Sequence, residues 1–384
     1  MKRSSNAALN LVDVSSDRVS VAQPVFNGRE KEYVDHCLDT GWISSAGEYI
    51  EKFEKQFAVH VQANHAIACF NGTVALHLAL LAKGVTAGDE VIVPSLTYIA
   101  TANVVRYCGA TPVFVDCEAD TWNIDPRMIE ERISDRTKGI IVVHLYGAPV
   151  DMDPVMELAK RRGLFVIEDA AQAHGSKYRG KPVGALGDAG TFSFFGNKII
   201  TTGEGGMITT NRTEIDQSMR LFRNQGMSPK KRYWFEMIGY NYRMTNLQAA
   251  IGCGQLEGID WHLNRRQEVV KAYREGLKGL DEIITLPVEK PYATHCYWMF
   301  TVLISDKSRV NRDALILKLD QDGIETRPIF YPMFMMPPYA ENADRYPVAA
   351  SVGIRGISLP THGALSSSDI SRVCERVRYH CKGE

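Results

Sequence analysis

The chain has 384 residues, with 44 lysines and arginines against 45 aspartates and glutamates, which gives a net charge of −1 at neutral pH. This balance gives no electrostatic basis for binding nucleic acid or an acidic membrane surface. The length suffices for two or three domains with substantial cores. The eight cysteines include no Cys-x-x-Cys pair, so we expect reduced thiols in a cytoplasmic protein.

The N-terminal part of the chain begins with a segment that we do not expect to fold. Residues 1–18 have no long apolar core and no cleavage site, which predicts a loose tail and not a signal peptide. No stretch approaches the ~20 apolar residues that a membrane-spanning helix needs. Two helices follow, one over Glu30–Leu38 and one around Phe53 and Phe57.

From His65 onward, short apolar strands alternate with helical patterns. Continuous apolar strands between helices are typical of a parallel sheet that is covered on both faces. We therefore predict a large α/β domain over residues 19–256. Its elements are expected at 65–70, 73–83, 90–94, 98–108, 111–116, 128–133, 139–147, 155–163, 164–169, 189–195 and 206–211.

The remaining residues, 257–384, predict a smaller α+β domain. It begins with a long helix over Trp261–Leu280 and continues with a strand at 298–304 and a helix at 312–323. A loop rich in Pro and Met follows at 327–339, and a closing helix begins at Ser368.

The stretch FSFFGNKIITTGEGG, residues 192–206, contains the residue that we expect to carry the chemistry. Lys198 lies between an apolar strand and a glycine-rich turn, where desolvation would lower the pKa of its amine and make it a nucleophile and base. Taken alone, a lysine at a strand end is more often a surface residue. A surface position for Lys198 is less favoured because another strand, LFVIED, ends in Glu168 and Asp169. Open α/β sheets bind ligands at such strand ends, and a lysine beside a carboxylate suggests pyridoxal 5′-phosphate (PLP).

Two further segments fit this interpretation. In CFNGTVALHLAL a strand ends, a turn follows at Asn71, Gly72 and Thr73, and an apolar helix begins. The first N–H groups of this helix could bind a phosphate. A plain strand-to-helix turn with Asn71 as its N-cap is the equal alternative. In PSLTYIATAN, Tyr98 follows a strand and could stack on a pyridine ring or pack in the core.

Three other motifs predict no site. GSKYRGK, residues 175–181, fits the start of a P-loop, but Pro182 stands where a Ser or Thr is required. The turn at Gly72 lacks the Gly-x-Gly-x-x-Gly of a dinucleotide fold. His144 has no second histidine or carboxylate at metal-ligand spacing, so we expect no zinc site.

Five motifs together carry a resemblance: NGTVALHLAL, PSLTYIATAN, EDAAQAHG, FSFFGNKIITTGEGG and GYNYRMTNLQAAIG. They resemble the PLP-dependent sugar aminotransferases of the DegT/StrS type, which act on nucleotide-linked keto sugars, and the match extends over nearly everything after Val19. The resemblance implies the fold type I architecture of aspartate aminotransferase. It also implies Lys198 as the Schiff-base lysine and Asp169 as the partner of the ring nitrogen.

The remaining site residues are likewise implied by the resemblance. Gln172 would lie near the ring hydroxyl, and Tyr98 would stack on the ring. Gly72, Thr73 and Ser193 would bind the phosphate. In this family an asparagine reaches the phosphate from the neighbouring subunit, and Asn241 is the matching position, which implies a homodimer with shared active sites.

Two segments indicate the substrate. RNQGMSPKKRYWF, residues 223–235, and IETRPIFYP, residues 324–332, most resemble members that use glutamate to aminate carbon 4 of GDP-4-keto-6-deoxymannose. The alternatives are a transaminase that acts on a UDP- or dTDP-linked keto sugar, a PLP-dependent dehydratase or lyase, and a non-catalytic binding protein. Relatives with histidine at the lysine position dehydrate their sugar, so Lys198 favours amination. One departure affects the substrate assignment: Met333 and Phe334 stand where many relatives have a histidine.

Overall fold

A seven-stranded sheet forms the centre of the computed structural model, which describes residues 18–383. The strand order is β1-β9-β8-β5-β4-β2-β3, and only β9 runs antiparallel to its neighbours β1 and β8. The predicted α/β class with a mostly parallel sheet is therefore confirmed. The strands are β1 (His65–Cys69), β2 (Glu90–Pro94), β3 (Thr111–Val115), β4 (Thr137–Val143), β5 (Phe165–Asp169), β8 (Ala189–Ser193) and β9 (Gly206–Thr210).

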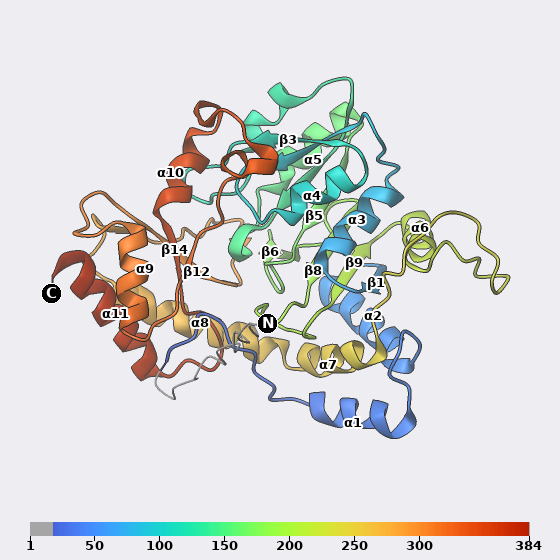
Figure 1. Ribbon diagram of the computed structural model, residues 1–384, viewed down its shortest axis with the longest axis horizontal. Helices are drawn as coiled ribbons and strands as arrows, with labels where there is room; N and C mark the ends of the chain where they lie inside the picture. The colour runs from blue at the N-terminus through green and yellow to red at the C-terminus, as the bar shows by residue number, and fades with distance from the viewer. Residues whose placement is uncertain (1–17, 384) are drawn as a thin grey trace, which may run out of the picture.

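Helices surround this sheet (Figure 1). They are α1 (Glu30–Thr40), α2 (Glu48–Val61), α3 (Gly72–Ala82), α4 (Ala100–Tyr107), α5 (Met152–Arg162), α6 (Thr213–Arg223) and α7 (Asn246–Glu257). The helix predicted at 128–133 is instead two 3₁₀ turns, η1 (Pro126–Met128) and η2 (Glu130–Arg132). Asp125 caps the first turn, but the chain becomes extended at Ile133, so the segment is too short for a stable α-helix.

The C-terminal part contains a second sheet of four strands in the order β10-β12-β14-β13. The strands are β10 (Ile284–Thr285), β12 (Phe300–Ile304), β13 (Arg327–Pro328) and β14 (Gly356–Leu359), and the helices beside them are α8 (Ile259–Gly276), α9 (Arg312–Gln321), α10 (Pro347–Arg355) and α11 (Ser367–Lys382). A separate apolar cluster, built mainly from residues after 268, fills this part. The domain boundary near residue 256 remains a prediction. Residues 1–17 of the predicted tail, 1–18, lie outside the described residues.

The segment that mimics a P-loop is a hairpin. β6 (Lys177–Tyr178) and β7 (Lys181–Pro182) pair antiparallel, and β6 also pairs with β11 (Ala293–Thr294). The connecting residues Arg179 and Gly180 both have positive φ, of 47° and 79°. Such a turn links two strands, whereas a P-loop leads into a helix.

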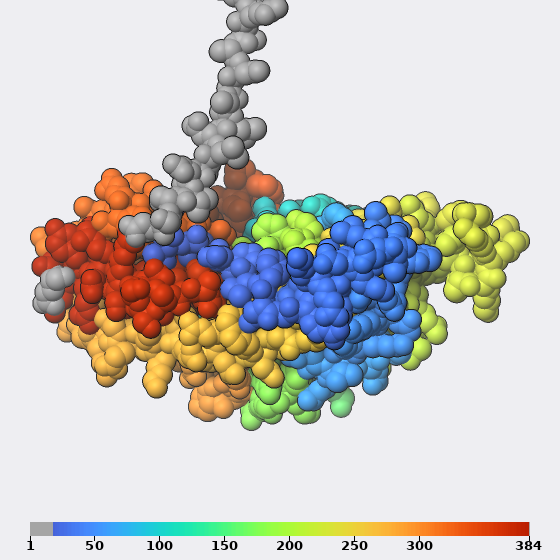
Figure 2. All heavy atoms as spheres, turned by 90° about the horizontal axis from the view of Figure 1, so that it is seen from below, coloured from blue at the N-terminus to red at the C-terminus, as the bar shows by residue number. Residues whose placement is uncertain are grey.

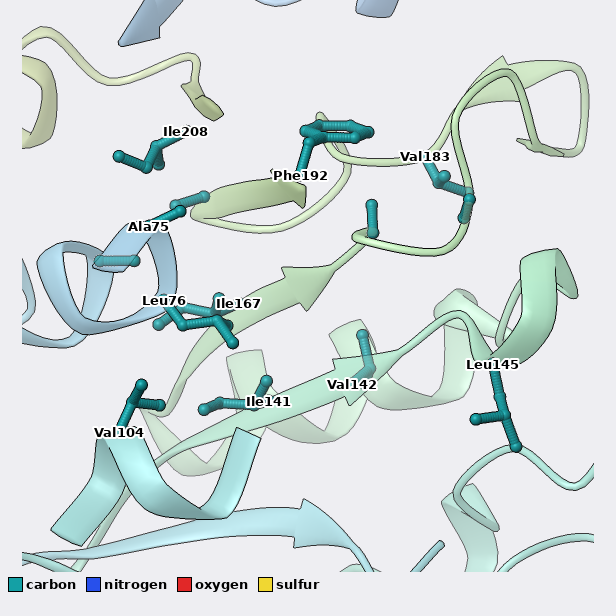
Figure 3. Close-up of a cluster of buried hydrophobic side chains, with 14 of the residues drawn as sticks. Ala75, Leu76, Val104, Ile141, Val142, Leu145, Ile167, Val183, Phe192 and Ile208 are labelled. Atoms are coloured by element: carbon teal, nitrogen blue, oxygen red, sulfur yellow. The ribbon is translucent and has the colours of Figure 1, made fainter. Parts of the chain in front are cut away.

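The main core lies between the sheet and its helices. Leu76 of α3, Ile141 of β4 and Ile167 of β5 are at most 2% exposed and belong to one cluster (Figure 3). Burial of such side chains contributes about 1.5–3 kcal/mol each. This packing fixes α3 against the sheet, so that its first turn lies beside the end of β8. Within residues 18–383, no helix is both long and apolar enough to cross a membrane.

The segment between α6 and α7, residues 224–241, projects from the body of the protein (Figures 1 and 2). Isolated bridges pair Asn224 with Asn241 at its base and Met227 with Phe235 further out. Several large apolar side chains on it are exposed, including Tyr233, Trp234 and Ile238. Exposure of such apolar side chains to water does not stabilise a monomer, and groups of them commonly mark an interaction surface.

Candidate active site

A cavity of about 430 Å³ opens at the carboxyl ends of the central strands, next to the C-terminal sheet. It brings together seven of the eight predicted site residues: Gly72, Thr73, Tyr98, Asp169, Gln172, Ser193 and Lys198. These residues come from four different segments, which the sheet places side by side. Ligand sites in open α/β sheets occupy this position.

Lys198 follows β8 and reaches into the cavity. Its side chain is partly accessible from the cavity, but its amine lies deep among protein atoms, 3.7 Å from the centre of the Trp298 ring. Burial lowers the pKa of this ammonium to about 7, while the nearby charge of Asp169 opposes the shift. An amine with such a pKa is partly neutral at physiological pH and can act as nucleophile, base and acid.

Asp169, at the end of β5, is a buried carboxylate that forms no ion pair among the described residues, although the charge of the Lys198 amine acts on it from a greater distance. It accepts hydrogen bonds from the Thr101 hydroxyl at 2.8 Å and from the Ala171 N–H at 3.2 Å. Burial raises the pKa of this carboxyl group. A protonated nitrogen in the cavity would supply the missing positive charge, as a pyridinium does.

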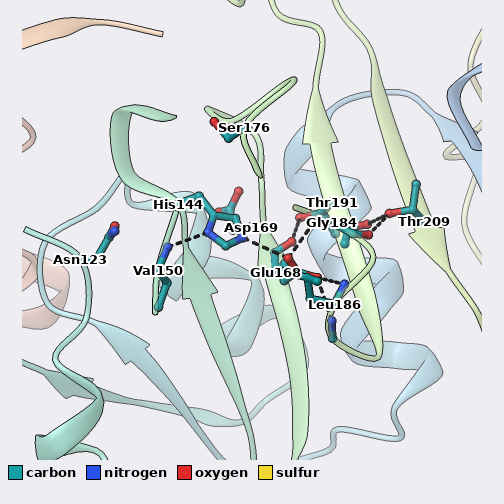
Figure 4. Close-up of polar contacts among 12 residues, drawn as sticks. Asn123, His144, Val150, Glu168, Asp169, Ser176, Gly184, Leu186, Thr191 and Thr209 are labelled. Carbon is teal, nitrogen blue, oxygen red and sulfur yellow. Dashed lines mark hydrogen bonds and ion pairs between the residues drawn. The ribbon is translucent and has the colours of Figure 1, made fainter. Parts of the chain in front are cut away.

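Glu168, the other predicted acid of this strand, has a different environment (Figure 4). Its carboxylate accepts hydrogen bonds from the N–H groups of Gly184, Leu186 and Gly187 at 2.7–2.8 Å. It also contacts Nε2 of His144 at 3.1 Å, and Nδ1 of the same ring accepts the Val150 N–H. Glu168 is therefore satisfied within the protein and holds the loop before β8.

The first turn of α3 forms one end of the cavity. The Asn71 side chain accepts the Val74 N–H at 3.0 Å, as predicted for an N-cap. The N–H groups of Gly72 and Thr73 lie in the first turn of the helix, where no carbonyl of an earlier turn can accept their hydrogen bonds. A Cβ on Gly72 would lie 2.8 Å from Cβ of Ser193, so only glycine fits this close approach. The N-cap and phosphate-binding interpretations therefore coexist: the cap orients a helix end that suits an anion.

Gln172 and Tyr98 differ in their degree of burial. Gln172 is buried, and its Oε1 accepts the Tyr146 N–H at 2.7 Å. Tyr98 is 56% exposed, with its ring 5.6 Å from that of Phe330. Core packing of Tyr98 is thus excluded, because a core tyrosine would be buried.

The second wall of the cavity was not identified from the sequence. Trp298 and Phe330 come from the C-terminal part. Both rings stack against Tyr146, at 5.8 and 5.1 Å between ring centres, and lie 6.3 Å from each other. The Phe330 N–H donates to the Tyr146 hydroxyl at 2.9 Å, and the Trp298 indole N–H donates to the Asn197 carbonyl at 2.7 Å. The aromatic residues in WMFTVLI and RPIFYP were visible in the sequence, but nothing local indicated that they face the lysine.

Two predicted features lie outside this cavity. Asn241 is exposed at the base of the projecting segment, and Arg243 donates to its side chain at 3.3 Å. Met333 and Phe334 are buried, and Phe334 stacks on Tyr346 with 4.9 Å between ring centres. Phe334 therefore packs within the protein and does not line the cavity.

Comparison with known proteins identifies the family. Residues 25–378 match the model of the DegT/DnrJ/EryC1/StrS aminotransferase family. The chain is 56% identical to the GDP-perosamine synthase of Caulobacter vibrioides over 93% of this chain and 96% of the relative. It is 49% identical to the GDP-perosamine synthase of Escherichia coli O157:H7 over 94% of this chain and 97% of the relative. A chain from Streptococcus pneumoniae solved in its PLP form has a TM-score of 0.88 at 28% identity, covering 93% of this chain and 97% of that chain.

The predicted cofactor and fold type agree with these relationships, since the Streptococcus pneumoniae neighbour was solved in its PLP form and shares the fold of this chain. The cavity also fits PLP on its own features. It offers a buried amine with a lowered pKa, a buried carboxylate without an ion pair among the described residues, and a helix N-terminus that begins with a glycine packed closely against Ser193. The chain belongs to the DegT/DnrJ/EryC1/StrS aminotransferase family and is a PLP-dependent transaminase.

Proposed function

We propose that this transaminase moves the amino group of glutamate to carbon 4 of GDP-4-keto-6-deoxymannose and so forms GDP-perosamine. Support comes from relatives that are GDP-perosamine synthases and align over nearly the whole chain. The observation that carries the transaminase chemistry is the buried amine of Lys198, whose pKa of about 7 suits proton transfer in both directions.

We assign the cofactor contacts as follows. Lys198 would bond covalently to PLP, and Asp169 would hold a proton on the ring nitrogen. Gly72, Thr73 and Ser193 would bind the phosphate, Gln172 would lie at the ring hydroxyl, and Tyr98 would stack on the ring. These assignments rest on the shared cavity that these residues line, together with the burial of Asp169 and the close approach of α3 to β8.

When bound, PLP supplies an electrophilic carbon and an electron sink. Lys198 Nζ then accepts the proton from the α carbon of glutamate in one half-reaction and returns a proton to sugar carbon 4 in the other. Asp169 keeps its partner nitrogen charged because a buried carboxylate is stabilised by a cation. The aromatic wall of Tyr146, Trp298 and Phe330 limits the access of water to the amine.

The substrate assignment is tested by a glutamate-dependent assay across GDP-, UDP- and dTDP-linked 4-keto-6-deoxy sugars. We expect the highest kcat/KM with GDP-4-keto-6-deoxymannose and one 2-oxoglutarate released for each amino sugar. Faster turnover of a UDP or dTDP sugar would contradict the GDP assignment and leave the transaminase assignment intact. Product formation without consumption of glutamate would instead indicate a dehydratase or lyase.

We further propose a homodimer in which Asn241 completes the partner's active site. Support comes from the exposed position of Asn241 outside its own cavity and from the exposed aromatic side chains of the projecting segment 224–241. An aspartate at this position would place a negative charge against the cofactor phosphate, so Asn241→Asp should be nearly inactive.

Mixed dimers test this arrangement. Lys198→Ala and Asn241→Asp are each expected to be nearly inactive alone. After the two variants are mixed and exchange subunits, about half of the dimers are mixed, and each mixed dimer has one intact site in two. Activity should then recover to roughly a quarter of wild type, as binomial mixing requires. No recovery despite demonstrated subunit exchange would mean that Asn241 does not serve the partner's site.

A further inference from the structure

Four charged side chains line the cavity: Asp169, Lys198, Glu204 and Arg327. Asp169 and Lys198 are assigned to the cofactor, and Glu204 is an acid. Arg327 is therefore the one positively charged side chain that the described residues leave for a substrate. No role has been assigned to it so far.

Arg327 is held at the cavity by a strand. It forms β13 with Pro328 and pairs with Ser358 of β14, and all three residues line the cavity. Phe330, three residues after Arg327, is fixed by the hydrogen bond to Tyr146. The backbone under Arg327 is thus anchored on both sides, as a residue that positions a ligand requires.

The guanidinium group itself is only lightly engaged. Its partner among the described residues is Glu325, whose Oε1 lies 3.5 Å from Nη2, at the outer limit of a hydrogen bond. The other oxygen of Glu325 accepts the Val21 N–H at 3.1 Å, which fixes the carboxylate. Because a guanidinium carries five N–H donors, most of those of Arg327 stay available.

The proposed reaction brings two anionic substrates into this cavity in turn. Glutamate has two carboxylates, and the nucleotide sugar has a diphosphate. Both groups match the planar fork of an arginine, which binds carboxylates and phosphates through paired hydrogen bonds. A substrate anion can readily compete with a Glu325 contact of 3.5 Å.

We propose that Arg327 binds the anionic group of the substrate, a carboxylate of the amino donor or the diphosphate of the sugar nucleotide. This inference rests on the proposed function for the identity of the two substrates. It makes Arg327 a determinant of substrate affinity on the wall opposite the cofactor contacts.

The competing interpretation is a surface ion pair between Arg327 and Glu325, and two variants separate the two ideas. If the pair is only structural, Arg327→Gln and Glu325→Gln should have the same effect. If Arg327 binds substrate, Arg327→Gln should raise a KM, whereas Glu325→Gln should leave that KM unchanged or lower it by freeing the guanidinium. Glu325→Gln retains an oxygen that can accept the Val21 N–H, so the fold is preserved.

The experiment uses the holoenzyme with Arg327→Gln, Arg327→Lys and a control, Arg345→Gln. Arg345 is as exposed as Arg327, at 48% against 46%, and pairs with Glu341 away from the cavity. KM and kcat are measured separately for glutamate and for the keto sugar. Binding of glutarate, a dicarboxylate that has no amino group to transfer, is measured by calorimetry as a readout independent of turnover.

We expect Arg327→Gln to raise the KM for at least one substrate about 10- to 100-fold, with partial recovery in Arg327→Lys. A change for glutamate and glutarate identifies a carboxylate as the ligand, and a change for the sugar nucleotide alone identifies the diphosphate. If Arg327→Gln matches Arg345→Gln for both substrates and for glutarate, the inference is wrong. The wild-type product in the same assay shows independently whether the proposed function holds.

Discussion

The cavity has two walls that the chain builds in different ways. The sheet wall carries buried charge: Asp169 and Lys198 each end or follow a strand of the central sheet. The C-terminal wall is aromatic, with Trp298 and Phe330, and its one charge, Arg327, is half exposed. A buried charge destabilises the fold unless an opposite charge lies beside it, so the sheet wall suits a permanently held cofactor. The exposed wall suits ligands that enter and leave.

This difference predicts two kinds of defect. A change on the sheet wall should impair both half-reactions alike, because both need the cofactor. A change on the C-terminal wall should affect one substrate more than the other, because the substrates meet that wall in turn. The predictions below concern the sheet wall and can each contradict this division.

The largest effect is expected from Lys198→Ala. Loss of the amine removes both the covalent attachment and the proton transfer, so both half-reactions should slow by about 1,000-fold or more. The measurement is the change in cofactor absorbance when glutamate or the keto sugar is added. Borohydride reduction of the wild type followed by peptide mapping should place the cofactor on Lys198. A label on another lysine would overturn the assignment.

The next largest effect is expected from Asp169→Asn, with a loss of about 3–5 kcal/mol, or roughly 10²- to 10⁴-fold in kcat/KM. The amide retains a hydrogen bond to the Thr101 hydroxyl but cannot stabilise a cation. Glu168→Gln is the matched control on the same strand. It breaks contacts to the loop before β8, so it should lower the unfolding temperature before it changes the cofactor spectrum. Equal spectral changes in both variants would contradict the separate roles of the two acids.

The pH dependence of stability should report the buried amine. The pKa of Lys198 falls from 10.5 in the unfolded chain to about 7 in the folded protein. The unfolded state therefore binds more protons between pH 7 and 10.5, and the cofactor-free protein gains stability as pH rises through this window. Below pH 7 the full penalty is present, about 2–4 kcal/mol after allowance for solvent in the cavity.

Lys198→Met removes this penalty. The cofactor-free variant should be more stable than wild type by that amount near pH 6.5, and by about a third of it at pH 9.5. Urea unfolding at the two pH values measures the difference, with the exposed Lys181→Met as a control. A difference that does not depend on pH would mean that the amine keeps its ordinary pKa.

The sheet wall is also the part that could be predicted from the sequence. Lys198 and Asp169 lie directly beside apolar strands, so a local pattern places each at the carboxyl edge of the sheet. Asn71 and Gly72 likewise mark a strand-to-helix turn within a few residues. These positions follow from short-range order, which periodicity and turn chemistry can indicate.

The other wall could not be predicted in this way. Trp298 lies 100 residues after Lys198 in the chain, and Arg327 sits on a strand of two residues, too short for any periodic pattern. Their position depends on how the C-terminal sheet packs against the loop that carries Tyr146. The predicted helix at 128–133 was wrong because six periodic residues do not establish an α-helix against a competing turn.

The smallest expected effect tests the phosphate end of the sheet wall. Gly72→Ala would place a Cβ 2.8 Å from Cβ of Ser193, so α3 or the end of β8 must shift by a few tenths of an ångström. The N–H groups that we assign to the phosphate move with the helix, and the affinity for PLP should fall by about 1–3 kcal/mol, or roughly 10- to 100-fold. Equilibrium titration of cofactor-free protein with PLP measures this change. Gly196→Ala is the control, because a Cβ there meets no atom within 4 Å. If Gly72→Ala binds PLP as tightly as Gly196→Ala, the phosphate does not lie at the start of α3, and the sheet wall holds the cofactor by its two charged residues without that helix end.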